Sequence, residues 1–243
     1  MNLARRASAE FTGTGLLVAA VVGSGIAATR LSPDDVGLQL LENAVATALA
    51  LAALILIFGP VSGAHLNPVV SAVDWWLGRP TRTGLAGRDL LAYALAQAAG
   101  AIGGAILANL MFGLPVVTAA ATARSGANLW LAETVATGGL VLLIVALARS
   151  GRAVTAPAAV GAYIGAAYWW TSSTSFANPA VTIGRMFSDT FAGIAPASAP
   201  AFLAAQIAGG LLAVAAIAWW YPGSRPAASD VVVPRAQQEA TPR

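Results

Sequence analysis

Two short motifs contain the residues whose types and spacing best support chemistry on a small molecule. They are Asn67–Val69, with the sequence Asn-Pro-Val, and Asn178–Ala180, with the sequence Asn-Pro-Ala. Asn is a strong N-cap, and Pro68 and Pro179 at the first helical position have no N–H to leave unsatisfied. Each motif therefore predicts the start of a short helix, with free backbone donors and a partial positive charge. Two such ends facing each other in apolar surroundings would oppose cations and admit neutral polar molecules.

Few other side chains are suited to catalysis or metal binding. The 243-residue sequence contains no Cys and a single His, His65, so it offers no thiolate ligand and no pair of His ligands. A Ser-His-Asp relay would have only this one candidate base. We therefore expect no catalytic residue, no metal site and no cofactor. The net charge of +3 is too small to indicate a nucleic-acid partner.

The composition is typical of an integral membrane protein. Hydrophobic residues make up 58% of the chain and charged residues 9%, whereas soluble domains carry about 25% charged residues. A helix needs about 20 apolar residues to cross the hydrocarbon core of a bilayer. Six segments meet this requirement and are predicted to span the membrane, at approximately Ala9–Ala28, Leu38–Phe58, Leu90–Phe112, Leu129–Ala148, Val154–Thr171 and Ala201–Tyr221.

Both Asn-Pro motifs lie between predicted spans, in segments too short to cross the membrane and too apolar for ordinary loops. Irregular backbone at membrane depth persists only where protein or a water-filled path satisfies its polar groups. We therefore predict re-entrant half-helices over Asn67–Leu77 and Asn178–Asp189.

The arginines predict the orientation of a multi-pass protein in the cell membrane. With both termini in the cytoplasm, ten Arg side chains fall inside and three outside, as the positive-inside rule requires. The inner ten are Arg5, Arg6, Arg79, Arg82, Arg88, Arg149, Arg152, Arg225, Arg235 and Arg243, and the outer three are Arg30, Arg124 and Arg185.

The two halves of the chain repeat one pattern. The sequence Glu-x-x-x-Thr-Gly-x-Leu-Val begins at both Glu10 and Glu133, and Ala-Gln-x-Ala-Gly surrounds both Gln97 and Gln206. Because each half has three spans, an odd number, the second half must enter the membrane from the opposite side. This predicts an inverted repeat with a solute site near the midplane.

The domain organisation follows from this repeat. We expect a cytoplasmic N-terminus at 1–7, a channel domain at 8–222 and a flexible cytoplasmic tail at 223–243. The two repeats within the channel domain are expected at about 8–112 and 128–221.

Residues 62–70, Ser-Gly-Ala-His-Leu-Asn-Pro-Val-Val, and 176–181, Phe-Ala-Asn-Pro-Ala-Val, closely resemble the paired signature of the aquaporin family, the major intrinsic proteins. The resemblance covers about residues 8–221. It implies an all-α membrane protein of six tilted transmembrane helices and two half-helices, with one pore per subunit in a homotetramer.

The resemblance also implies roles for individual residues. Asn67 and Asn178 would donate hydrogen bonds to solute oxygens at the pore midpoint. Glu10 and Glu133 would accept hydrogen bonds from the re-entrant loops. His65 is expected to line the cytoplasmic vestibule or to order a carbonyl group.

The sequence departs from the family pattern at the outer constriction. Most members place Arg directly after the second triplet, where this chain has Val181. By the family's spacing, the other three filter positions are Thr47, Ala166 and Ser175. These four small side chains predict a constriction that is wider and more apolar than in a strict water channel, without a fixed charge.

Two further residues bear on the pore. Val69 replaces the usual Ala of the first triplet, and its branch is expected to pack against the other half-helix. Arg185 lies one helical turn beyond Val181. It either reaches back toward the pore mouth or lies on the surface, paired with Asp189.

The resemblance implies a passive channel for small uncharged solutes, namely water, glycerol-like solutes and undissociated arsenous acid, in contact with the lipid bilayer. One alternative is an ion-coupled transporter, for which only His65, Glu10 and Glu133 offer titratable groups. Another is an intramembrane enzyme, which the shortage of nucleophile–base pairs disfavours. A closed structural member of the family is a further alternative that the sequence leaves open.

Overall fold

The computed structural model describes residues 2–80 and 83–221. Over these residues the chain forms α-helices and two 3₁₀ turns and contains no strands. The α-helices are α1 (Leu3–Leu31), α2 (Val36–Ser62), α3 (Pro68–Gly78), α4 (Gly87–Met111), α5 (Ala127–Arg149), α6 (Ala156–Trp170), α7 (Pro179–Gly184) and α8 (Ala199–Trp220). The predicted tail at 223–243 lies outside the described residues.

Five helices in the described part of the chain, α1, α2, α4, α5 and α8, are long and apolar enough to cross a membrane. The remaining predicted span, Val154–Thr171, is helical over nearly the predicted bounds, but only part of it is α-helix. It consists of the 3₁₀ turn η1 (Ala153–Thr155) and the 15-residue helix α6. Such a helix extends about 22 Å, against a hydrocarbon core of roughly 30 Å. The all-helical membrane fold is confirmed, and α6 is its shortest predicted span.

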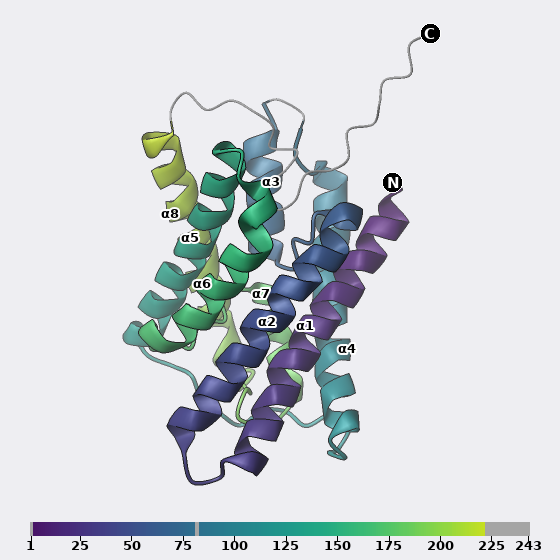
Figure 1. Cartoon of the computed structure of the whole chain (residues 1–243), viewed down its shortest axis with the longest axis vertical. Coiled ribbons are helices and arrows are strands. Elements are labelled where there is room, and N and C mark those ends of the chain that lie inside the picture. The colour runs from purple at the N-terminus through teal and green to yellow at the C-terminus, as the bar shows by residue number, and fades with distance from the viewer. Residues whose placement is uncertain (1, 81–82, 222–243) are drawn as a thin grey trace.

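Helices α3 and α7 are the two half-helices. Asn67 and Asn178 cap them in extended conformations with the same φ of −156°, and Pro68 and Pro179 are the first helical residues. Helix α7 ends at Gly184 and continues as the 3₁₀ turn η2 (Arg185–Phe187). In Figure 1, α3 lies toward the end of the molecule where the chain begins, and α7 lies nearer the centre.

The inverted repeat reappears in the packing, because α1 packs on α4 as α5 packs on α8. Glycines bring both pairs into backbone contact. A Cβ atom at Gly100 would lie 2.1 Å from the carbonyl oxygen of Phe11, and one at Gly209 would lie 2.3 Å from that of Thr134. Small residues at such crossings are the usual means of close helix association in membranes.

We expect Gly100→Ala to lower the unfolding temperature of the protein in detergent. The added methyl group has no room beside the Phe11 carbonyl, and overpacking of this kind costs about 1–3 kcal/mol. Gly103→Ala is the matched control, because a Cβ there would meet only the far end of the Phe11 ring at 4.0 Å. Equal unfolding temperatures for the two variants would contradict the close crossing.

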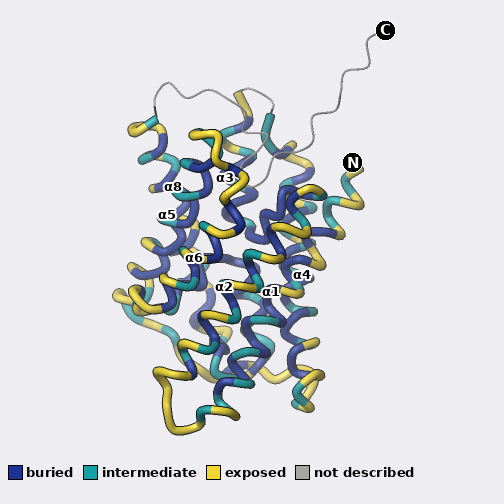
Figure 2. The backbone as a smooth tube through the Cα atoms, in the orientation of Figure 1, coloured by how far each residue is buried: buried dark blue, intermediate teal, exposed yellow. Residues whose placement is uncertain are grey.

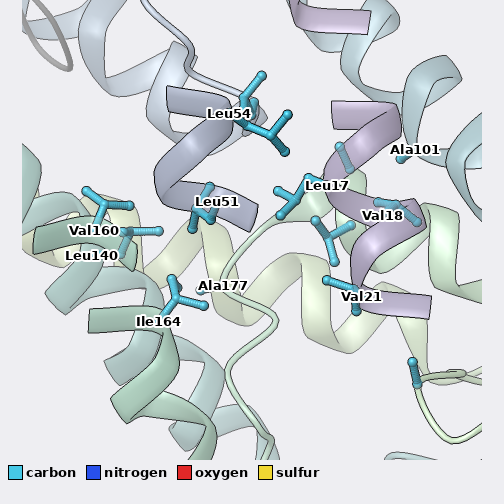
Figure 3. Close-up of a cluster of buried hydrophobic side chains, with 14 of the residues drawn as sticks. Leu17, Val18, Val21, Leu51, Leu54, Ala101, Leu140, Val160, Ile164 and Ala177 are labelled. Atoms are coloured by element: carbon cyan, nitrogen blue, oxygen red, sulfur yellow. The ribbon is translucent and has the colours of Figure 1, made fainter. Parts of the chain in front are cut away.

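The buried residues form the interior between the long helices, and exposed residues lie at both ends and on outward faces (Figure 2). Figure 3 shows part of this core, where Leu17 of α1, Leu51 of α2, Leu140 of α5 and Ile164 of α6 gather around Ala177. Large apolar side chains remain exposed on the outer faces of the single chain. So many exposed large apolar side chains are expected where a protein contacts lipid or another subunit.

Candidate functional site

The two Asn-Pro motifs meet inside the protein and hold each other's loops. The Asn67 Nδ2 atom donates to the carbonyl oxygen of Ala177 at 2.8 Å, and the Asn178 Nδ2 atom donates to that of Leu66 at 2.7 Å. Their Oδ1 atoms accept from backbone N–H groups in the first turn of their own helices. Since a carboxamide nitrogen carries two hydrogens, each Asn keeps one N–H for a further acceptor.

The first loop is held by the buried carboxylate of Glu10. This carboxylate accepts hydrogen bonds from the backbone N–H groups of His65 at 3.0 Å and Leu66 at 2.7 Å. It also accepts from the Ser62 hydroxyl at 2.6 Å and the Gln97 Nε2 atom at 2.7 Å. Both carboxylate oxygens are therefore occupied by donors from the end of α2, from the loop and from α4.

Glu133 holds the second loop in the same way. It accepts from the backbone N–H groups of Phe176 at 2.8 Å and Ala177 at 2.9 Å. The Ser173 hydroxyl and the Gln206 Nε2 atom donate to it at 2.6 Å and 2.7 Å. The two halves thus use equivalent donors, which shows that the sequence repeat is also a repeat of the hydrogen-bond network.

Both loops contain strained backbone next to the Asn residues. Ala64 and Leu66 have φ values of 47° and 48°, and the equivalent Ser175 and Ala177 have 49° and 50°. Non-glycine residues seldom adopt this left-handed region, and they do so where surrounding contacts enforce it. The hydrogen bonds to Glu10 supply such contacts in the first loop, and those to the corresponding glutamate supply them in the second.

We expect Glu133→Gln to lower thermal stability while the folded molecules keep their solute selectivity. The substitution removes charge from an acceptor whose hydrogen bonds are typically worth about 1.5–3 kcal/mol each. Glu42→Gln is the matched control, because Glu42 is only partly buried and accepts a hydrogen bond of 2.9 Å from the Ser32 hydroxyl. The measurement is thermal unfolding in detergent together with solute flux. A stable Glu133→Gln protein with altered pH dependence of flux would instead favour proton coupling.

A cavity of about 50 Å³ lies at the junction of the two motifs. This is several times the roughly 10–15 Å³ that one water molecule requires. Its wall is mostly aliphatic, with side chains from α1, α2, α5 and α6. The polar side chains that line it are Thr47, His65, Asn67, Tyr168, Ser175, Asn178 and Arg185.

Three of the four predicted filter residues, Thr47, Ser175 and Val181, line this cavity. The Ser175 hydroxyl is buried and has no hydrogen-bond partner among the described residues. Val181 is buried in the first turn of α7 and contributes an apolar surface.

The prediction for Ala166 is wrong, because this residue is exposed and does not line the cavity. The cavity face of α6 is the stripe Val160, Ile164 and Tyr168, with helical spacing of four residues. Residues two positions apart point in nearly opposite directions on a helix. Tyr168, which the sequence analysis missed, therefore takes this place in the wall. The three-residue stripe, read as a helix face, is the signal that would have found it.

Tyr168 connects the cavity wall to α2. Its hydroxyl group shares a hydrogen bond of 3.2 Å with the Thr47 hydroxyl. This part of the cavity wall is thus more polar than predicted for the four filter positions, because hydroxyl groups come from Thr47, Tyr168 and Ser175.

His65 lines the cavity near the first motif and is also bound to its surroundings. Its Nδ1 atom lies 3.1 Å from the Ser71 hydroxyl, and its Nε2 atom lies 3.9 Å from a carboxylate oxygen of Asp74. Its ring packs edge-on against Tyr93, with 5.5 Å between the ring centres. These contacts fasten His65 to α3 and α4.

Val69 does not pack as predicted. Its buried side chain belongs to an apolar cluster with Val73, Val141 and Ala213, whose members come from α3, α5 and α8 and not from α7. A Cβ atom at Gly210 would lie only 2.6 Å from the Val69 Cγ1 atom. The extra branch is accommodated by a glycine on α8, because this face of α3 points away from the other half-helix.

Arg185 is buried, which rules out the surface position and the pairing with Asp189. Its Nε atom donates to the carbonyl oxygen of Ala192, and its guanidinium carbon lies 3.4 Å from the centre of the Phe176 ring. Asp189 instead accepts from the backbone N–H of Ala121 at 2.9 Å. The Arg185 side chain turns back and lines the cavity.

Arg124, from the segment between α4 and α5, lies over the same ring at 5.2 Å. Its Nε atom donates to the carbonyl of Gly193 at 2.8 Å, and an Nη atom donates to that of Phe191 at 3.2 Å. Burial lowers the pKa of the Arg124 guanidinium, although nearby Tyr168 and Glu133 raise it. Because the ordinary pKa of Arg is so high, the side chain stays charged at neutral pH.

Comparison of the sequence with known proteins identifies a family and several relatives. A family model described as "Major intrinsic protein" matches residues 1–175. The chain is 50% identical over 225 residues to "Aquaglyceroporin AqpS" of Rhizobium meliloti (strain 1021), covering 93% of this chain and 94% of that protein. It is 31% identical over 252 residues to "Probable aquaporin AqpM" of Archaeoglobus fulgidus, covering 91% of this chain and 97% of that protein.

The fold is also found among solved structures. The X-ray structure of the aquaglyceroporin from Plasmodium falciparum matches with a TM-score of 0.66 at 19% sequence identity. The match covers 91% of this chain and 98% of that chain.

Proposed function

This chain belongs to the major intrinsic protein family, and on that basis we propose that it is a passive channel through which small uncharged solutes cross the membrane. Its relatives named above are an aquaglyceroporin and an aquaporin. The observation that carries the proposal is the cavity at the centre of the protein, onto which both Asn67 and Asn178 open. The family consists of channels and not of enzymes, so we assign no catalytic residue.

The two Asn side chains account for conduction without proton transfer. Each one keeps an N–H beyond the bond that it donates to the opposite loop. A water oxygen that accepts from both groups has used its lone pairs and cannot accept a proton from the next water. Neutral solutes pass by exchanging hydrogen bonds, while the aliphatic remainder of the wall binds them weakly.

The outer constriction is formed, in this proposal, by Thr47, Tyr168, Ser175 and Val181. Three hydroxyl groups and one apolar side chain face a solute there, without a charge at the Val181 position. This combination favours small solutes that carry several hydroxyl groups. Glycerol fits this description, and so does undissociated arsenous acid, which is proposed from family resemblance.

Both termini are proposed to be cytoplasmic, with the subunits assembled as a homotetramer. The distribution of arginines supports this orientation. In Figure 1 the C-terminal end of α8 and the N-terminus of the chain lie toward the same end of the molecule, which places both termini on one side of the membrane. Exposed apolar residues such as Leu49, Leu56 and Leu211 supply surfaces for lipid and for neighbouring subunits.

The test is osmotic shrinkage of proteoliposomes, followed by stopped-flow light scattering. We expect vesicles with the purified protein to equilibrate glycerol several times faster than vesicles without protein, and to conduct water as well. Arsenite and urea gradients, applied to the same preparation, define the range of solutes. Identical rates in protein-containing and empty vesicles for every neutral solute would refute the channel.

A further inference from the structure

We infer that Arg185 supplies the fixed positive charge that excludes cations from this pore, one helical turn outside the position where Val181 has replaced Arg. The inference rests on the proposed channel function. It assigns cation exclusion to Arg185, a residue outside the four that form the constriction. The four constriction residues set the width and the hydroxyl contacts, and Arg185 sets the charge selectivity.

The first support is the position of the charge. Arg185 is the C-cap of α7 and keeps a helical backbone conformation, so it follows Val181 by about 6 Å along the helix axis. Both Val181 and Arg185 line the cavity, and so does Ser175 with its unpartnered hydroxyl. A solute at the constriction therefore occupies the same cavity that the guanidinium group lines.

The second support is how the Arg185 side chain uses its donors. Its Nε atom is bound to Ala192, but its two Nη nitrogens make no hydrogen bond within the described part of the chain. The Arg185 side chain is among those that line the cavity. A guanidinium carries five N–H donors, which leaves four for solute oxygens or water.

The third support is that a buried aromatic ring holds the guanidinium group of Arg185 in place. The guanidinium lies 3.4 Å from the centre of the Phe176 ring, and cations bind favourably over aromatic faces. Phe176 packs edge-on against Phe202, with 5.2 Å between ring centres, and both belong to one buried cluster with Ile194. The charge is thus held in place at the wall and does not swing into the opening.

The fourth support is the absence of a direct ion pair, although the buried carboxylate of Glu133 lies near enough to both arginines to interact with their charges. Among residues 2–80 and 83–221, neither Arg185 nor Arg124 forms an ion pair with a carboxylate, and both lie over the Phe176 ring. Two positive charges on one ring give the cavity a positive outer end. A passing cation is repelled, whereas a neutral solute gains donors.

The size of the effect follows from Coulomb's law. At a separation of about 6 Å and an effective dielectric constant of about 20, one unit charge changes the occupancy of a like charge roughly a hundredfold. Screening by salt reduces this, so we expect a change of at least about tenfold when Arg185 is neutralised.

The experiment compares guanidinium, a flat cation no larger than glycerol, with glycerol itself in proteoliposomes. In Arg185→Gln and in Arg185→Met, we expect guanidinium influx relative to glycerol influx to rise by at least about tenfold. The Gln side chain retains a donor for the Ala192 carbonyl, and the Met side chain retains an apolar stem on Phe176. Arg185→Lys keeps the charge and is expected to exclude guanidinium.

Two further variants separate charge from structure. The double variant Val181→Arg with Arg185→Gln returns a charge to the constriction and is expected to restore exclusion of guanidinium. Arg30→Gln is the control, because Arg30 donates to the Phe112 carbonyl and does not line the cavity.

The outcomes distinguish this inference from the proposed function. If wild-type vesicles fail to conduct any neutral solute, the channel proposal itself is wrong. If either neutral variant conducts glycerol but excludes guanidinium as well as the wild type does, Arg185 is not the selectivity charge. A proportional rise of glycerol and guanidinium influx would show only a widened pore, and it would also overturn the inference.

Discussion

Vesicles that carry Asn178→Asp are expected to lose glycerol permeability by at least about tenfold, an added barrier of about 1.4 kcal/mol, and to leak cations. The wild-type Nδ2 atom donates to the Leu66 carbonyl oxygen at 2.7 Å. In the Asp variant a carboxylate oxygen would take its place, so two hydrogen-bond acceptors would face each other. The remaining oxygen can still cap α7 by accepting from Ala180 and Val181. The half-helix therefore survives, while the junction loses its donor and gains a negative charge.

The measurement is glycerol flux and potassium conductance in the same reconstituted preparation. Asn128→Asp is the matched control, because Asn128 is exposed at the start of α5 and lies outside the cavity. Asn67→Asp is expected to behave like Asn178→Asp, since the two residues hold equivalent positions. Unchanged flux and selectivity in well-folded Asn178→Asp protein would show that this Asn does not face the solute.

Val181→Arg is expected to reduce glycerol permeability by at least about tenfold, corresponding to about 1.4 kcal/mol, and to reduce water permeability much less. The guanidinium would project into the ring formed by Thr47, Tyr168 and Ser175, where it narrows the opening. Its fixed fork of donors favours small acceptors such as water. Arg185 lies one turn away, so the two like charges also repel each other.

Val181→Leu is the control for this variant, because it adds apolar bulk without a charge or a donor. Stopped-flow permeabilities to water and glycerol are measured for both proteins. We expect only the Arg variant to change the ratio of the two permeabilities strongly. A proportional loss of both permeabilities in Val181→Arg, or no change in either, would place Val181 outside the constriction.

The sequence predicted the parts of this structure that depend on local signals. Apolar length locates the long helices, and Asn followed by Pro marks the start of both half-helices. The mirrored hydrogen bonds of Glu10 and Glu133 follow a repeat that is visible in the sequence itself. Each of these features is set by residue type and spacing within one element or by comparison of the two halves.

The sequence did not predict features that depend on the rotation of a helix. Ala166 was assigned by counting back across the loop before Asn178, but α6 turns Tyr168 toward the cavity instead. Val69 likewise faces α8 because of the orientation of α3, and its fit depends on the absence of a side chain at Gly210. Such rotations are decided by tertiary packing, which a single sequence does not display.

Arg185 shows a further reason why the sequence did not predict the site fully, namely that the end of a helix was placed wrongly. The pairing with Asp189 assumed that the helix continues for another turn, whereas α7 ends at Gly184 and Ser188 is already extended, with φ of −141°. Spacing rules for side-chain pairs hold only within a helix. Once the helix ends, the arginine finds its partners in the Ala192 carbonyl and the Phe176 ring.

The central claim, passive conduction through the cavity between the two Asn side chains, is tested most directly by the concentration dependence of glycerol influx. The measurement uses proteoliposomes with no proton or sodium gradient. A passive channel predicts an initial influx that rises linearly with glycerol concentration and does not change when either gradient is imposed. Saturation at low glycerol concentration, or influx that requires a proton or sodium gradient, would contradict it and identify a coupled transporter.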